Sequence, residues 1–181
     1  MPAFADDPKP LGDSLTGEAK ALYEIGKSSF DGGDVPGALG RFTRAFELSN
    51  DPRLLWNMAA CEAGLKHYAR AMTLVDRYLG TSGSLLTDKD RQQATRFRAA
   101  AKPLVATVTL GVANEVKITV DGEPVPTSSV LYLDAGKRRV TFTRPGHRGI
   151  VRTETVTGGS DLAWKVELKR LEINAPPGSS P

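Results

Sequence analysis

The stretch GGDVPGALGRFTRAFELSNDP, residues 32–52, decides the helical half of the fold. Two glycines and an aspartate precede a run in which apolar and small residues recur at helical spacing. Asp34 has a side chain suited to cap a helix that begins at the next residue. Pro36 is tolerated in the first turn, because the backbone N–H groups there lack helical partners. The glycines therefore end one helix and the aspartate begins the next, which predicts a helical hairpin.

A degraded copy of this pattern, LKHYARAMTLVDRYL, occupies residues 65–79. Small residues align with small ones and large with large at a spacing of 33 positions, in the pairs Gly26–Ala59, Ala38–Ala71 and Phe42–Val75. A helix-turn-helix unit that repeats at this length is typical of a solenoid, in which each unit buries its apolar face against the next. The pattern predicts two stacked hairpins, at residues 15–49 and 52–80.

The first hairpin resembles a tetratricopeptide repeat (TPR). The resemblance rests on the Gly33-Asp34 turn and on small and large residues at Gly26, Ala38, Phe42 and Ala45. It implies that the second hairpin is also TPR-like.

The segment DKDRQQATRFRAAAK, residues 88–102, is expected to form a terminal helix that covers the open end of the stack. Its apolar residues Ala94, Phe97 and Ala101 fall on one face. Three arginines are expected to face solvent, namely Arg91, Arg96 and Arg98.

From Leu104 onward the apolar residues alternate with polar ones, which indicates β-strands. Turn residues such as Asp121-Gly122 and Gly158-Gly159 separate the runs. Six strands at this spacing predict a small antiparallel sandwich. The six runs are LVATVTL (104–110), VKITV (116–120), SVLYLD (129–134), RRVTFT (138–143), IVRTETV (150–156) and LAWKVEL (162–168).

This half resembles the bacterial PEGA domain over residues 105–170. The likeness is carried by ITVDGEPV (118–125), LDAGKRRVTF (133–142) and RPGH (144–147). The sequence thus predicts an α+β fold with two domains, an all-α domain of TPR-like hairpins with a terminal helix and a PEGA-like antiparallel β-sandwich. The predicted boundaries are 1–14 for a tail or signal-peptide remnant, 15–102, 103–172, and 173–181 for a second tail.

The charge, the apolar runs and the cysteine count of the chain bear on which functions it can have. A net charge of +3 with a pI near 9.1 is weak support for nucleic-acid binding, and no apolar run approaches the roughly 20 residues of a membrane span. The single cysteine, Cys61, excludes an internal disulfide. Ala3 and Ala5 before Asp6 resemble the end of a secretory signal. We therefore expect a periplasmic protein, the alternative being a cytoplasmic one that starts at Met1.

Residues that carry chemistry are sparse. His67, His147 and Cys61 do not have the spacing of metal ligands. No serine stands in a nucleophile elbow, and no Gly-rich loop joins a strand to a helix. The sequence predicts a protein without enzymatic activity, cofactor or metal.

The remaining candidate for a functional site is a binding surface on the helical half. In the TPR resemblance the first helix of each hairpin lines a concave groove. Cations and aromatic side chains there suit an extended peptide with acidic groups. The alternative for Trp56 is core packing between hairpins. The candidate partner-binding residues are Lys20, Tyr23, Lys27, Arg53, Trp56 and Asn57.

Three functional hypotheses follow. The first is an envelope-associated adaptor that binds a protein or peptide partner through the TPR-like groove. The second is a carbohydrate- or peptidoglycan-binding module that uses the β-sandwich, where Arg138-Arg139, Arg144, His147 and Arg148 cluster; the alternative for this cluster is a solubilising role. The third is a cytoplasmic interaction scaffold.

Overall fold

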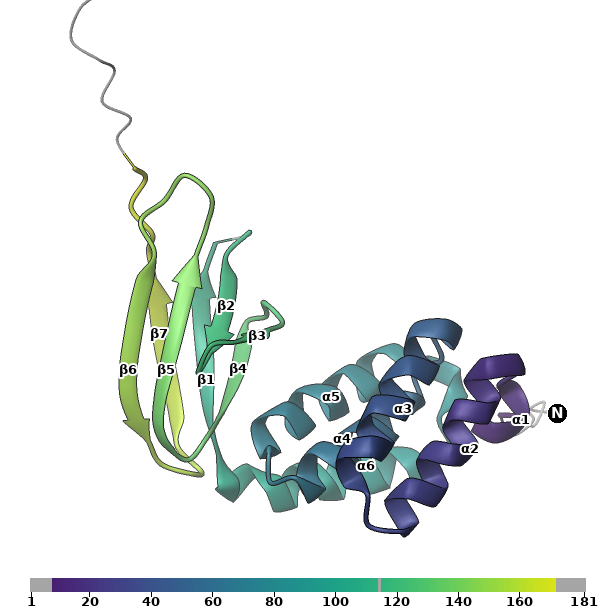
Figure 1. Ribbon diagram of the computed structural model, residues 1–181. Coiled ribbons are helices and arrows are strands. Elements are labelled where there is room, and N and C mark those ends of the chain that lie inside the picture. Colours follow the sequence, from purple (N-terminus) through teal and green to yellow (C-terminus); the bar gives the residue numbers. More distant parts are fainter. Residues whose placement is uncertain (1–7, 114, 172–181) are drawn as a thin grey trace, which may run out of the picture.

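The computed structural model describes residues 8–113 and 115–171, which fold as a helical part followed by two β-sheets (Figure 1). The α+β fold class is therefore confirmed. Ala3 and Ala5 and the predicted tail 173–181 lie outside the described residues. The helices are α1 (Leu11–Ser14), α2 (Gly17–Asp31), α3 (Val35–Ser49), α4 (Leu54–Gly64), α5 (Tyr68–Thr81) and α6 (Asp88–Ala101), with 3₁₀ turns at Gly83–Leu85 and Lys102–Leu104.

The turn between α2 and α3 forms as the sequence predicts. Asp34 is the N-cap of α3, and its Oδ1 accepts a hydrogen bond from the Gly37 N–H at 2.9 Å. Gly33 has φ +84°, a left-handed conformation that glycine adopts at little cost. Among the described helices, none is both long and apolar enough to cross a bilayer.

The small residues of the repeat lie where helices cross. A Cβ atom added at Gly26 of α2 would lie 2.8 Å from the Phe42 ring of α3, so only glycine permits this approach. Ala38 is fully buried beside it, and Ala59 and Ala71 are equally buried in the second pair of helices. The 33-residue spacing therefore corresponds to equivalent buried positions in α2–α3 and α4–α5.

Helix α6 packs with the face that the sequence predicts. Ala94 and Ala101 are buried, and Phe97 packs against the core between α4 and α5. Arg96 and Arg98 are exposed and Arg91 is partly buried, and the Nε atom of Arg98 also lies 2.9 Å from Oδ1 of Asp76 in α5. The charge of Arg98 is held by that carboxylate.

The β part consists of a three-stranded sheet in the order β4-β1-β7 and a four-stranded sheet in the order β3-β2-β5-β6. Apolar side chains of both sheets form one core, which includes Val108, Ile118, Leu133, Phe142 and Trp164. The strands are β1 (Val105–Val112), β2 (Lys117–Val120), β3 (Glu123–Val125), β4 (Val130–Asp134), β5 (Gly136–Thr143), β6 (Ile150–Val156) and β7 (Asp161–Val166).

Two features of the β part differ from the sequence prediction. The sheets are not wholly antiparallel, since β7 runs parallel to β1. After β6 the chain turns at Gly158-Gly159 into the other sheet, where β7 occupies the free side of β1 in the same direction. Strand β3 is absent from the prediction, because it is only three residues long and contains Pro124.

Strand β4 lies against α5 and joins the two parts. The Tyr132 hydroxyl of β4 donates to Oδ2 of Asp76 at 2.6 Å, the same carboxylate that faces Arg98. At the start of α5 the Ala69 N–H donates to Oδ1 of Asp134 at 2.9 Å. A small buried cluster fills the space between, made of Met72, Ala101, Val105 and Tyr132.

Replacing Tyr132 with phenylalanine tests this junction. The change removes a hydrogen bond to a charged carboxylate, which lowers the free energy of unfolding by about 1.5–3 kcal/mol in urea denaturation. Tyr68→Phe is the matched control, because the Tyr68 hydroxyl makes no hydrogen bond to any described residue. Equal stability of the two variants would contradict the role assigned to Asp76.

Candidate functional site

The predicted groove residues of the first hairpin form a small surface cluster. The Tyr23 ring packs on Phe42 with 6.1 Å between ring centroids. Lys27 Nζ lies 5.4 Å from the Tyr23 centroid and 3.4 Å from Oε2 of Glu24. Lys20 is exposed on the same helix. Tyr23 and Lys27 therefore lie next to each other, and they also contact Phe42 and Glu24, respectively.

Two of the three predicted groove residues of the second hairpin already contact other residues of the chain. Arg53 is 9% exposed, its guanidinium bonds both carboxylate oxygens of Asp51, and it also donates to the Lys9 carbonyl. Trp56 lies between Tyr78 and Phe97, with centroid distances of 5.7 and 6.0 Å. Asn57 is half-buried. These contacts account for Arg53 and Trp56 without a ligand.

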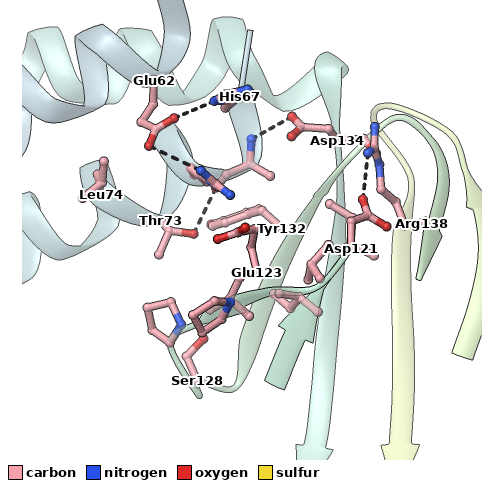
Figure 2. A pocket seen from close by; sticks show the side chains of 18 of the residues that line it. Glu62, His67, Thr73, Leu74, Asp121, Glu123, Ser128, Tyr132, Asp134 and Arg138 are labelled. Carbon is pink, nitrogen blue, oxygen red and sulfur yellow. Dashed lines mark hydrogen bonds and ion pairs between the residues drawn. The ribbon is translucent and has the colours of Figure 1, made fainter. Parts of the chain in front are cut away.

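A cleft of about 450 Å³ lies elsewhere, between the helices and the sheets (Figure 2). Helices α3, α4 and α5 form one wall. The β2–β3 hairpin, the loop after it and strand β4 form the other. We call this the central cleft. Its volume is within the roughly 300–1,000 Å³ of ordinary ligand sites.

Apolar side chains line much of both walls. Leu39, Met58 and Leu74 come from the three helices, and Pro124 and Pro126 flank the residue that ends β3. Proline lacks an N–H donor, so β3 is poorly suited to pair with a further strand through this edge.

One end of the central cleft is polar. Glu62 of α4, whose side chain is only 10% exposed, has its Oε2 atom 2.8 Å from Nδ1 of His67. Its other oxygen lies 4.0 Å from Nη1 of Arg70. Figure 2 shows Glu62 and His67 converging at this end, above Tyr132 and Asp134. The buried carboxylate is thereby held between a cation and an imidazole.

The β wall carries three further carboxylates. Asp121 accepts the Arg139 N–H at 2.8 Å and pairs with Arg138 at 2.9 Å. The backbone hydrogen bond is the largest of these influences, and together they hold the pKa of Asp121 below its usual value. Asp134 accepts from Ala69. Glu123, in contrast, has no ion pair with any residue of 8–113 or 115–171.

The outer edge of β4 faces the cleft. The Leu110 N–H donates to the Ser129 carbonyl, which fixes the alternation of the β1–β4 ladder. Leu131 and Leu133 therefore bond to β1, and the backbone groups of Tyr132 are directed away from it. Within the described residues, no hydrogen bond is made by the Tyr132 N–H or C=O. Tyr132 as a whole is only 9% exposed, so little of this strand edge is open to solvent.

The reactive groups near the cleft are restrained. Burial raises the pKa of the Cys61 thiol to about 11, so the thiol is protonated at neutral pH. No hydroxyl or thiol of the described chain is hydrogen-bonded to His67, and the Thr73 hydroxyl donates to the Ala69 carbonyl. Across 8–113 and 115–171, no three His, Cys, Asp or Glu side chains are placed to share a metal ion. The arrangement is suited to binding a ligand.

The chain matches no model of a known protein family, and no curated protein is significantly similar to it.

The cleft residues are not among those predicted from the sequence. The turn predicted at Asp121-Gly122 is confirmed by φ values of +52° and +92°. Nothing local to that turn indicates that it faces α3 and α5, because the opposite wall lies far away along the chain.

Replacing Trp56 with alanine separates packing from ligand binding. Because Trp56 fills the space between Tyr78 and Phe97, the variant should lose about 2–4 kcal/mol of unfolding free energy. Lys27→Ala should leave stability nearly unchanged, since its ion pair is exposed on both sides. Urea denaturation measures both. A Trp56→Ala protein as stable as the parent would return Trp56 to the list of binding candidates.

Proposed function

We propose that this chain is a non-enzymatic adaptor that binds a polypeptide segment of a partner protein in the central cleft. The observation that carries the proposal is the cleft itself, which combines apolar walls from both parts of the chain with a backbone N–H and C=O of β4, at Tyr132, that make no hydrogen bond within the described residues. Apolar contacts give affinity and the strand edge gives direction, as in other proteins that bind peptides as an added strand.

In this proposal the helical part is a TPR-like pair of hairpins and the β part is a PEGA-like sandwich. Equivalent burial of Ala38 and Ala71, and of Phe42 and Val75, supports the first assignment. The single core shared by both sheets supports the second. We further propose that the protein works in the bacterial envelope, as the signal-like Ala3 and Ala5 suggest. The binding mode is the same for a cytoplasmic scaffold.

The charges that line the central cleft indicate the charge of the proposed ligand. Glu62, Asp121, Glu123 and Asp134 outnumber Arg70 and Arg138, so the cleft is negative although the whole chain carries +3. Glu123 is the carboxylate left for a ligand. The proposed ligand is therefore a short extended segment with apolar side chains and a lysine or arginine, held by a charge-assisted hydrogen bond. This differs from the ligand expected for the TPR-like groove predicted from the sequence, which is an acidic peptide.

A peptide selection tests the proposal. An immobilised library of random seven-residue peptides should yield binders rich in apolar residues and Lys or Arg. Glu123→Lys should weaken those binders about tenfold, because it replaces an attraction by a repulsion. Leu74→Arg should abolish binding by filling the apolar wall with a charge.

Glu47→Lys is the matched control. Glu47 lies on α3 outside the cleft and forms an exposed ion pair with Arg44, so its reversal makes the same charge change at a remote site. Binders without a basic residue, or binders equally weakened by Glu47→Lys, would contradict the proposed site.

A second candidate function is binding of an anionic cell-wall polymer. The register of the four-stranded sheet places Lys117, Lys137 and Arg139 on its outer face, together with threonines of β2, β5 and β6. None of the strand residues on that face is acidic. Hydroxyls and cations on one face are suited to a polymer that carries both hydroxyl and anionic groups.

Cosedimentation of the full chain with purified cell wall tests this candidate. The triple variant Lys117→Glu, Lys137→Glu, Arg139→Glu should remain in the supernatant. The control triple variant Lys20→Glu, Lys89→Glu, Arg96→Glu changes the net charge equally on exposed helical positions, and should still sediment. Equal loss in both variants would show only a dependence on net charge.

A further inference from the structure

Strand β6 is an open edge of the four-stranded sheet. It pairs with β5 on one side, and no described strand pairs with its other side. Ile150 is 36% exposed and Val151 52% exposed, which is unusual for such side chains in a sheet. Figure 1 places β6 on the side of the sheets away from the helices.

The free backbone groups of β6 can be assigned. The Asp121 N–H donates to the Arg139 carbonyl, so Arg139 and Thr141 of β5 bond toward β2. The alternate residues of β5 bond toward β6, where they meet Arg152 and Glu154. The N–H and C=O groups that are directed away from β5 are those of Val151, Thr153 and Thr155. Within the described residues these groups make no hydrogen bond.

We propose that two copies of this chain associate by antiparallel pairing of their β6 strands, with Thr153 opposite Thr153 of the second copy. In this register Val151 lies opposite Thr155 of the second copy, so every outward-directed residue of β6 finds a hydrogen-bonding partner. The two four-stranded sheets become one continuous sheet.

The charges of β6 select this register. Arg152 lies opposite Glu154 of the second copy, and the two-fold symmetry repeats the pair. These are non-hydrogen-bonded pairs, whose Cα atoms lie about 4.5 Å apart and whose side chains are closest. Sliding one strand by two residues places Arg152 opposite Arg152, or Glu154 opposite Glu154. Both alternatives set like charges against each other.

Arg152 also contacts the three-stranded sheet. Its guanidinium carbon lies 4.6 Å from the centroid of the Trp164 ring in β7, which holds the cation at the open edge between the sheets. Arg152 and Glu154 are opposite Val140 and Arg138 of β5, so both side chains lie on the same face of the sheet.

The self-complementary order of these charges identifies the occupant as a second copy. Inward-facing charges on an edge strand usually prevent pairing with other strands. Here they penalise any partner except one that presents a glutamate opposite Arg152 and an arginine opposite Glu154, which β6 itself does. The inference goes beyond the proposed function. Strand β3, which borders the central cleft, is at the other edge of the sheet, so each copy keeps its cleft.

Sedimentation equilibrium of the full chain, from about 5 to 500 µM, tests the inference, since a short strand interface gives weak association. The parent should shift from monomer to dimer as concentration rises. Arg152→Glu and Glu154→Arg should each weaken the dimer by about tenfold or more, because both symmetric pairs become repulsive.

An equimolar mixture of the two variants is the decisive measurement. In a mixed dimer one β6 strand carries glutamate at both positions and the other carries arginine at both, so each cross-strand pair again joins opposite charges. The mixture should therefore recover the parent's association. Recovery also shows that neither variant fails through misfolding. Arg139→Glu, on the outer face of β5, is the control and should associate like the parent.

A parent that stays monomeric throughout this range would overturn the inference. So would single variants that associate as the parent does, or a mixture that fails to recover. Peptide binding in the central cleft is measured on the same variants and should be unchanged by Arg152→Glu, so failure of self-association leaves the proposed function standing.

Discussion

The Asp76 carboxylate joins three elements, and the position of the sheets relative to the helices depends on it. One oxygen accepts the Tyr132 hydroxyl of β4 and the other faces Arg98 of α6, while the residue itself belongs to α5. Tyr132 belongs to the buried cluster with Met72 and Val105, whereas the Asp76 and Arg98 side chains are 35% and 44% exposed, so their ion pair is partly screened by water. Burial raises the pKa of Tyr132, and its hydrogen bond to Asp76 acts in the same direction. The hydroxyl therefore remains a donor.

The central cleft is a consequence of this junction. Its helical wall and its β wall come from different parts of the chain, so they have a defined separation only if β4 is fixed on α5. Asp134 fixes the other end of the same contact by accepting the Ala69 N–H. A cleft held open in this way loses little conformational entropy when a ligand enters, which favours binding. Strand β6, an edge of the other sheet, takes no part in the junction, and the proposed association between copies therefore leaves the cleft intact.

The sequence predicted the local features because their causes are local. Asp34 caps α3 through a residue three positions away, and Asp121-Gly122 adopts the turn that its residue types favour. The 33-residue spacing placed Ala38 and Ala71 correctly in the core. The site was harder to predict. A tryptophan at helical spacing has the same pattern in a groove and in a core, and Trp56 packs between Tyr78 and Phe97. The cleft depends on contacts such as that of Ala69 with Asp134, 65 positions apart, which no local pattern reports.

The most direct test of this account measures whether the helical and β parts share one orientation in solution. Residual dipolar couplings of backbone amides in weakly aligned protein report the orientation of every element against a common frame. With β4 fixed on α5, a single alignment tensor is expected to fit the amides of α2–α6 and of β1–β7 together, with the relative orientation described above. Two independent tensors of different magnitude would show that the parts move separately, and the central cleft would then have no fixed geometry.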